Sequence, residues 1–289
     1  MMRSSKKPAN PRIEYRQTIS QEQHTMNEST IDPIIFSGYS KEYLFVENNY
    51  ENNTILEKHA EGQISELIGL LVAPVSVMLE SRLWGSTILP GIVSTNILKK
   101  EELTIIDFGG GAGKQFVEIT RAIDQPSLVG KIRYHLIEMP KLCSLIEPKL
   151  KEIFEPIWNN LFHLSSSVNV KHSDIVSCTS SLQYIENYVK QIEDLLATKP
   201  EFFLIINTPV NNKYTYCRYQ HNLAVKISQW VFSLSKLDKI FEERGYARIF
   251  FSAHEQNHMT LDTPSGSGTL QGSLIYQKIT SKETTNQIS

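Results

Sequence analysis

The sequence predicts an α/β fold in which helices cover a mostly parallel β-sheet. From Leu103 onward, short apolar runs alternate with amphipathic stretches, as in repeated β-α units. A glycine-rich turn follows the first of these runs, at the point where a strand would pass into a helix. Seven runs are predicted to be strands: residues 103–108, 132–138, 161–166, 174–180, 201–207, 247–253 and 273–279.

Helical spacing of apolar residues marks two of the segments between these strands. From Tyr188 to Leu196 the apolar side chains fall on one face of a helix. A later helix is predicted to begin after Ser235 as its N-cap and to end at Gly245.

The rest of the chain divides into three parts. Residues 1–32 are polar and can bury little apolar surface, which predicts a disordered tail. Residues 33–102 contain aromatic segments followed by apolar residues at helical spacing, which predicts a helical cap. Residues 103–280 are expected to form the main domain, and residues 281–289 a short C-terminal tail.

Composition excludes several classes of function. The net charge is −2 and no block of basic residues runs through the chain, so nucleic acid is not an expected partner. The three cysteines form no C-x-x-C pair, which favours a reducing cytoplasm over a disulfide framework or zinc ribbon. No apolar run reaches the roughly 18 residues that a membrane span needs, so no membrane association is expected. None of these features specifies an oligomeric state.

Residues 105–116, IIDFGGGAGKQF, contain a glycine-rich run followed by a lysine, as several nucleotide-binding loops do. In a P-loop that ended at Lys114, the first glycine would be replaced by Phe108 and the magnesium-binding hydroxyl by Gln115. The dinucleotide fingerprint G-x-G-x-x-G fails as well, because its third glycine falls on a lysine or a phenylalanine. Lys114 is therefore expected on a solvated face of the following helix.

The loop does contain the pattern D-x-G-x-G-x-G, formed by Asp107, Gly109, Gly111 and Gly113. This pattern resembles the first motif of the class I S-adenosylmethionine-dependent methyltransferases. The resemblance implies a Rossmann-like fold with a seven-stranded sheet whose last strand is antiparallel, and S-adenosylmethionine as cofactor. It also implies that the loop, Gly110 included, passes close to the methionyl end and the ribose, since small residues permit close backbone approach.

Glu138 ends the next predicted strand, where the superfamily places an acid that accepts hydrogen bonds from both ribose hydroxyls. Met139 follows it and is assigned to the same cofactor site; a solvent-facing glutamate at a strand end is the alternative for Glu138. Over residues 34–279, the segments DFGGGAG, HLIEMPKL, DIVSCTSSLQYIENY and FFLIINTPV resemble one little-characterised family within the superfamily.

The resemblance places the meeting point of methyl donor and acceptor after the fourth and fifth strands. Ser180 and Ser181 are assigned there to cofactor binding, and Tyr184 and Asn207 to the acceptor side. Packing of a half-buried aromatic ring is the alternative for Tyr184. Many superfamily members hold the adenine amino group with an acid after the third strand, but residues 165–167 are all serine here, which leaves the adenine contact unassigned.

Residues 254–258 spell HEQNH, a complete H-E-x-x-H motif. On a helix, His254 and His258 could bind zinc with Glu255 as general base. The flanking segments disfavour a helix, since a β-like run precedes the motif and Pro and Gly follow it, and no metal site is assigned. After the sixth strand of a methyltransferase, His254 would instead be a candidate general base for a hydroxyl acceptor, with an exposed polar loop as the alternative.

The sequence therefore predicts an S-adenosylmethionine-dependent methyltransferase that acts on a small-molecule or saccharide-type acceptor, by O-methylation. A zinc-dependent hydrolase and a catalytically silent methyltransferase-like binding module are the two alternatives.

Overall fold

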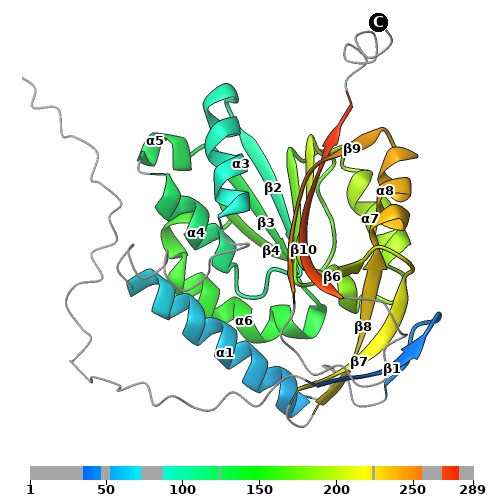
Figure 1. The fold of residues 1–289 in the computed structure, drawn as a ribbon. Helices are drawn as coiled ribbons and strands as arrows, with labels where there is room; N and C mark the ends of the chain where they lie inside the picture. Colours follow the sequence, from blue (N-terminus) through cyan, green and yellow to red (C-terminus); the bar gives the residue numbers. More distant parts are fainter. Residues whose placement is uncertain are drawn as a thin grey trace, which may run out of the picture.

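The computed structural model describes residues 35–46, 53–72, 87–123, 125–222, 225–255 and 269–279. Within these ranges, ten strands form one sheet with helices on both of its faces (Figure 1). The predicted tails, residues 1–32 and 281–289, lie outside the described residues. No helix in the described ranges combines the length and the apolar character needed to cross a bilayer.

The seven predicted strands form the central part of the sheet. They are β2 (Leu103–Phe108), β3 (Ile132–Ile137), β4 (Phe162–Ser165), β5 (Ile175–Thr179), β6 (Phe202–Asn211), β9 (Tyr246–Glu255) and β10 (Leu270–Lys278). Their spatial order is β4-β3-β2-β5-β6-β10-β9. Strands β2 to β6 pair in parallel, and β10 is antiparallel to both of its neighbours. The predicted fold class is confirmed.

Three further strands extend this sheet: β1 (Ile35–Ser40), β7 (Tyr216–Asn222) and β8 (Val225–Ser233). Strand β7 pairs antiparallel with both β1 and β8, and the last two residues of β6 pair with β8. The prediction of a helical cap is therefore wrong for residues 35–40. Their pairing with β7 shifts register between Ser37 and Ser40, and Gly38 in this segment has a φ of 75°. The regular alternation of apolar and polar residues by which a strand is recognised in a sequence is therefore missing.

The helices are α1 (Asn53–Val72), α3 (Ile88–Asn96), α4 (Lys114–Ala122), α5 (Pro126–Val129), α6 (Pro140–Ile153), α7 (Tyr188–Leu196) and α8 (Leu234–Glu242). Short 3-10 turns are η1 (Ile97–Lys99), η2 (Glu155–Ile157) and η3 (Leu182–Tyr184). Helix α8 starts after Ser233 and not after the predicted Ser235, because Leu234 already belongs to its buried face. Gly245, at φ 77°, follows its end as predicted.

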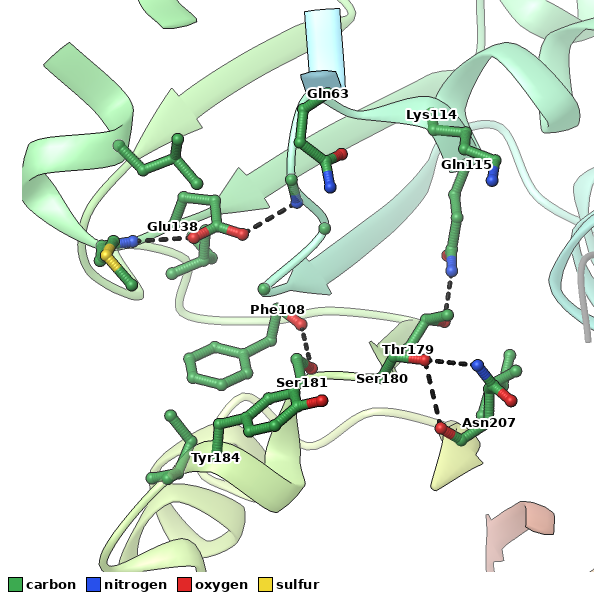
Figure 2. A pocket seen from close by; sticks show the side chains of 18 of the residues that line it. Gln63, Phe108, Lys114, Gln115, Glu138, Thr179, Ser180, Ser181, Tyr184 and Asn207 are labelled. Atoms are coloured by element: carbon green, nitrogen blue, oxygen red, sulfur yellow. Dashed lines mark hydrogen bonds between the residues drawn. The ribbon is translucent and has the colours of Figure 1, made fainter. Parts of the chain in front are cut away.

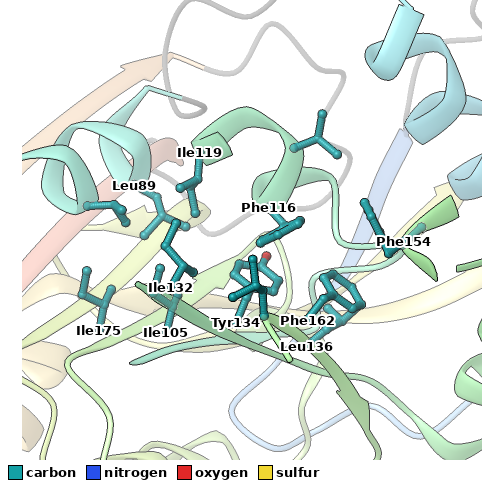
Figure 3. Close-up of a cluster of buried hydrophobic side chains, with 14 of the residues drawn as sticks. Leu89, Ile105, Phe116, Ile119, Ile132, Tyr134, Leu136, Phe154, Phe162 and Ile175 are labelled. Atoms are coloured by element: carbon teal, nitrogen blue, oxygen red, sulfur yellow. The ribbon is translucent and has the colours of Figure 1, made fainter. Parts of the chain in front are cut away.

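Helices α1, α3, α4 and α6 share one apolar cluster with the sheet, and α7 and α8 pack into a second cluster. Aromatic rings fill the first cluster between α4, α6 and strands β3 and β4 (Figure 3). The ring of Phe116 lies edge-on to Phe162 with centroids 5.3 Å apart, and 5.2 Å from the ring of Tyr134. A Cβ at Gly113 would lie 2.8 Å from the Phe162 ring, so this core also fixes the start of α4.

Candidate functional site

A cavity of about 910 Å³ opens at the carboxyl ends of the parallel strands, where ligands commonly bind in open α/β sheets (Figure 2). Most of the predicted site residues line it. These are Gly109, Gly110, Gly111, Glu138, Met139, Ser180, Ser181, Tyr184, Asn207 and His254.

The loop between β2 and α4 forms one wall of the cavity with its bare backbone. Gly109 and Gly111 have φ angles of 68° and 61°, in the left-handed region that other residues rarely adopt. A Cβ built on any of Gly109, Gly110 and Gly111 would lie within 3.0 Å of a neighbouring side chain. The nearest atoms belong to Ser181, Asp107 and Gln63, so close packing leaves no room for a side chain at these three positions. We call residues 109–111 the glycine cradle; their backbone faces the cavity without side chains.

Glu138 stands at the end of β3 with its carboxylate tied to this loop. One carboxylate oxygen accepts the backbone N–H of Gly111 at 2.8 Å, and the other accepts the N–H of Met139 at 3.0 Å. Burial raises the pKa of Glu138, and these two backbone donors lower it. A carboxylate offers about four acceptor positions, so an oriented Glu138 retains capacity for two further donors. The carboxylate is part of the cavity wall and does not simply face solvent.

Asp107 lies behind the loop and does not line the cavity. Its carboxyl is fully buried, accepts the hydroxyl of Tyr134 through Oδ2, and has no hydrogen-bond partner at Oδ1. Burial raises the pKa of Asp107 to about 7; the Tyr134 hydroxyl opposes the shift, and the nearby acids Glu138 and Glu118 add to it. Asp107 and Gly113 therefore support the loop without lining the cavity.

The ends of β5 and β6 form the opposite wall. Ser180 and Asn207 adopt φ angles of 51° and 55°, which for residues other than glycine cost about 1–3 kcal/mol each. They hold each other in place, since Asn207 Nδ2 donates to Ser180 Oγ at 2.6 Å and Ser180 Oγ donates to the Asn207 carbonyl at 3.2 Å. Ser181 Oγ donates to the carbonyl of Phe108 at 2.7 Å and so fastens this wall to the glycine loop.

Tyr184 contributes its ring to the cavity, but its hydroxyl belongs to a buried polar network. The hydroxyl donates to Gln220 Oε1 at 2.9 Å, an oxygen that also accepts Gln229 Nε2 at 3.0 Å. Arg218 Nε donates in turn to Gln229 Oε1 at 2.9 Å. Burial raises the pKa of Tyr184. These contacts make Tyr184 a fixed part of the cavity wall, and its raised pKa keeps the hydroxyl protonated.

His254 lines the cavity from the end of β9, where it pairs with Gln271 of β10. His254 and Glu255 both continue a strand, so the helix that zinc binding requires is not formed at these two residues. His258 lies outside the described residues. Among the described residues no group of three or more potential metal ligands comes together, and the zinc alternative gains no support.

Sequence reasoning missed the contribution of α1. One face of this helix lines the cavity through Leu56, His59, Gln63 and Glu66. The Gln63 carboxamide lies against Gly111, and Lys114 Nζ forms an ion pair with Glu66 at 3.0 Å. Figure 2 shows the side chains of Gln63 and Lys114. Lys114 therefore connects the loop to α1 through this ion pair, whereas the sequence predicted it on a solvated helix face. Helical periodicity predicts α1 but does not say which of its side chains meet the loop.

The comparison of the chain with known proteins identifies its fold. No family model and no curated protein sequence matches the chain. The crystal structure of the [4+2]-cyclase SpnF aligns with 83% of this chain and 99% of its own, at 9% identity and a TM-score of 0.50. Together with the order of the seven central strands and the antiparallel β10, this likeness decides the architecture. The chain has the class I methyltransferase fold.

Two further solved structures to which the chain is similar contain bound S-adenosylhomocysteine. Magnesium protoporphyrin IX methyltransferase (ChlM) from Synechocystis PCC 6803 aligns with 79% of this chain and 100% of its own, at 12% identity and a TM-score of 0.47. The 1,6-didemethyltoxoflavin-N1-methyltransferase of Burkholderia thailandensis aligns with 82% and 93%, at 10% identity and a TM-score of 0.46. Sequence identities this low do not transfer an activity from one protein to another. The activity of this chain must therefore be inferred from the residues of its own site.

Proposed function

We propose that this protein is an S-adenosylmethionine-dependent methyltransferase acting on a small-molecule acceptor. The observation that carries the proposal is the glycine cradle at Gly109–Gly111, whose Gly111 N–H is bound to the carboxylate of Glu138. This arrangement suits a ligand that packs directly against the loop backbone and donates two neighbouring hydroxyls to the Glu138 carboxylate. The ribose of S-adenosylmethionine carries such a pair of hydroxyls. When bound, this cofactor supplies a methyl group activated by its sulfonium.

The chain's own residues then divide into three roles. Gly109, Gly110 and Gly111 admit the cofactor to the loop backbone, and Glu138, followed by Met139, accepts the ribose hydroxyls. Asp107 and Gly113 support the loop from behind. Ser180 and Ser181 build the facing wall, and Gln63 of α1 covers the loop on the solvent side and helps to exclude water. Alignment of the acceptor with the transferable methyl would supply most of the rate.

The acceptor side of the proposed site is formed by Tyr184, Asn207 and His254. A cavity of about 910 Å³ has the size of a small-molecule site, and the chain's charge of −2 offers no surface for a polyanion. We therefore assign a small hydroxylated acceptor of the saccharide type and O-methylation, with His254 taking up the proton of the reacting hydroxyl. Tyr184 and Asn207 would position that hydroxyl.

The three cysteines support a cytoplasmic location. Cys143, Cys178 and Cys217 are all free thiols in the structure, as is usual in a reducing compartment.

Turnover tests this function. The protein is incubated with methyl-labelled S-adenosylmethionine and a panel of small hydroxylated compounds, and S-adenosylhomocysteine release is measured. We expect release that depends on an added acceptor. A chain that binds the cofactor yet releases no product with any acceptor would be the catalytically silent binding module, and a chain that binds no cofactor would contradict the proposal.

A further inference from the structure

A second cavity of about 530 Å³ adjoins the first on the side of α7. Phe108, Ile137, Ser166 and Gln191 line both cavities. The rest of the second wall comes from the segment after β4 and from the end of α7 and the residues after it: Ser167, Val168, Val170, Lys171, Asp194, Ala197 and Thr198. Ile137 directly precedes Glu138 in the chain. The wall that the two cavities share therefore extends from Glu138, the proposed ribose acceptor, to α7.

The floor of this shared region is apolar. Phe108 and Ile137 are register partners in the β2–β3 pair, so their side chains leave the sheet next to each other. Figure 2 shows the Phe108 ring turned toward the side of the loop on which Glu138 lies, and away from Lys114 and Gln115. Val168 and Val170 add apolar surface to the second cavity. This wall suits a flat aromatic base better than the charged methionyl end of the cofactor.

Gln191 is a polar side chain that the region leaves open. It is half-buried on α7, and its carboxamide makes no hydrogen bond or other polar contact with the described residues. Two other polar groups of α7 are engaged: Asp194 accepts from Lys190 at 2.6 Å, and Asn187 caps the Lys190 N–H at 3.1 Å. Ser167 Oγ donates to Asn169 at 3.1 Å. A half-buried amide with an open donor and an open acceptor favours a ligand that carries both.

We infer that Gln191 recognises the adenine base of the cofactor; this inference rests on the proposed function. With the ribose at Glu138, the attached base reaches the apolar wall formed by Phe108 and Ile137. The Gln191 carboxamide matches the adenine edge, because its oxygen accepts from the 6-amino group while its nitrogen donates to a ring nitrogen. Gln191 thereby takes the place of an acid after the third strand, where this chain has only serines at 165–167.

Competition binding to the full-length protein tests the inference. Adenosine and purine riboside, which lacks the 6-amino group, are titrated against bound S-adenosylhomocysteine in the wild type, Gln191→Leu and Glu193→Gln. Glu193 is the control because its exposed carboxylate on α7 pairs with Arg244 and lines neither cavity. We expect the wild type and Glu193→Gln to prefer adenosine by about 5- to 10-fold, the contribution of one neutral hydrogen bond. In Gln191→Leu the preference should fall to about 1. A general disturbance of the fold would weaken both nucleosides together and leave their ratio unchanged.

Three results would overturn the inference: a preference that survives in Gln191→Leu, a preference that is lost equally in Gln191→Leu and Glu193→Gln, or no preference in the wild type. In each of them S-adenosylhomocysteine would still bind to the wild type, and the proposed function would stand. If the wild type bound neither S-adenosylhomocysteine nor adenosine, the proposed function and this inference would both fail.

Discussion

The backbone N–H of Gly111 donates a hydrogen bond of 2.8 Å to the carboxylate of Glu138. This bond joins the loop after β2 to the end of β3, so the glycine cradle and the proposed ribose acceptor form one rigid unit. The second oxygen of Glu138 is held by the N–H of Met139, which fixes the plane of the carboxylate before any ligand arrives.

Replacing Glu138 with alanine is expected to weaken the binding of S-adenosylhomocysteine by about 10- to 100-fold, because hydrogen bonds to a charged group contribute about 1.5–3 kcal/mol. Isothermal titration calorimetry measures the loss. Glu147→Ala is the matched control, since Glu147 is exposed on α6 and pairs with Lys151 at 2.8 Å. An affinity that is unchanged in Glu138→Ala would rule out the assigned role.

The buried carboxyl of Asp107 predicts an unusual dependence of stability on pH. Its pKa in the folded protein, about 7, lies above the ordinary value of 3.8, so folding favours the protonated form. The stability that this group contributes is complete below about pH 4 and is lost as the pH rises through 7. The shift corresponds to a change in the free energy of unfolding on the order of 4 kcal/mol.

Asp107→Asn tests this dependence, because asparagine stays neutral and can still accept the Tyr134 hydroxyl. Urea denaturation of both proteins between pH 4 and pH 8 should give similar stabilities at the acid end and a more stable variant at the alkaline end. Other titrating groups are common to both proteins and cancel in the difference. Two parallel curves would show that Asp107 does not titrate in this range.

Replacing His254 with alanine is expected to lower turnover about 100-fold or more, since a general base typically contributes at least that factor. The affinity for S-adenosylhomocysteine should stay the same, because the proposed function assigns His254 to the acceptor side and not to cofactor binding. His172→Ala, an exposed histidine outside the cavity, serves as the control. Near-normal turnover of His254→Ala would dismiss His254 as the base.

The central strands could be predicted because parallel strands buried on both faces are nearly continuous apolar runs, as in LTIIDF and FFLII. Strands β7 and β8 could not, because they carry buried polar residues such as Arg218, Gln220 and Gln229. Those side chains are tolerated inside since they hydrogen-bond to one another, a relationship that exists only after the strands have paired.

The same distinction applies to the site. Gly111 and Glu138 belong to short local motifs, each at the end of a predicted strand, and the resemblance of these motifs to those of class I methyltransferases points to both residues. Gln63 and Gln191 reach the cavity only through the packing of α1 and α7 against the sheet. The sequence around them shows helical periodicity and no feature that separates them from other polar residues of the same helices.

Calorimetric titration with S-adenosylmethionine and S-adenosylhomocysteine, comparing the wild type with Gly111→Arg, tests the assignment of the glycine loop most directly. Gly69→Ala is the control, because a Cβ at Gly69 of α1 would meet nothing within 4 Å. We predict that the wild type and Gly69→Ala bind both ligands and that Gly111→Arg binds neither. The arginine side chain would displace Gln63 at the cavity wall, crowd the loop backbone that the ligand must approach, and adopt a left-handed φ. Equal binding by the wild type and Gly111→Arg, or binding by neither, would contradict the assignment.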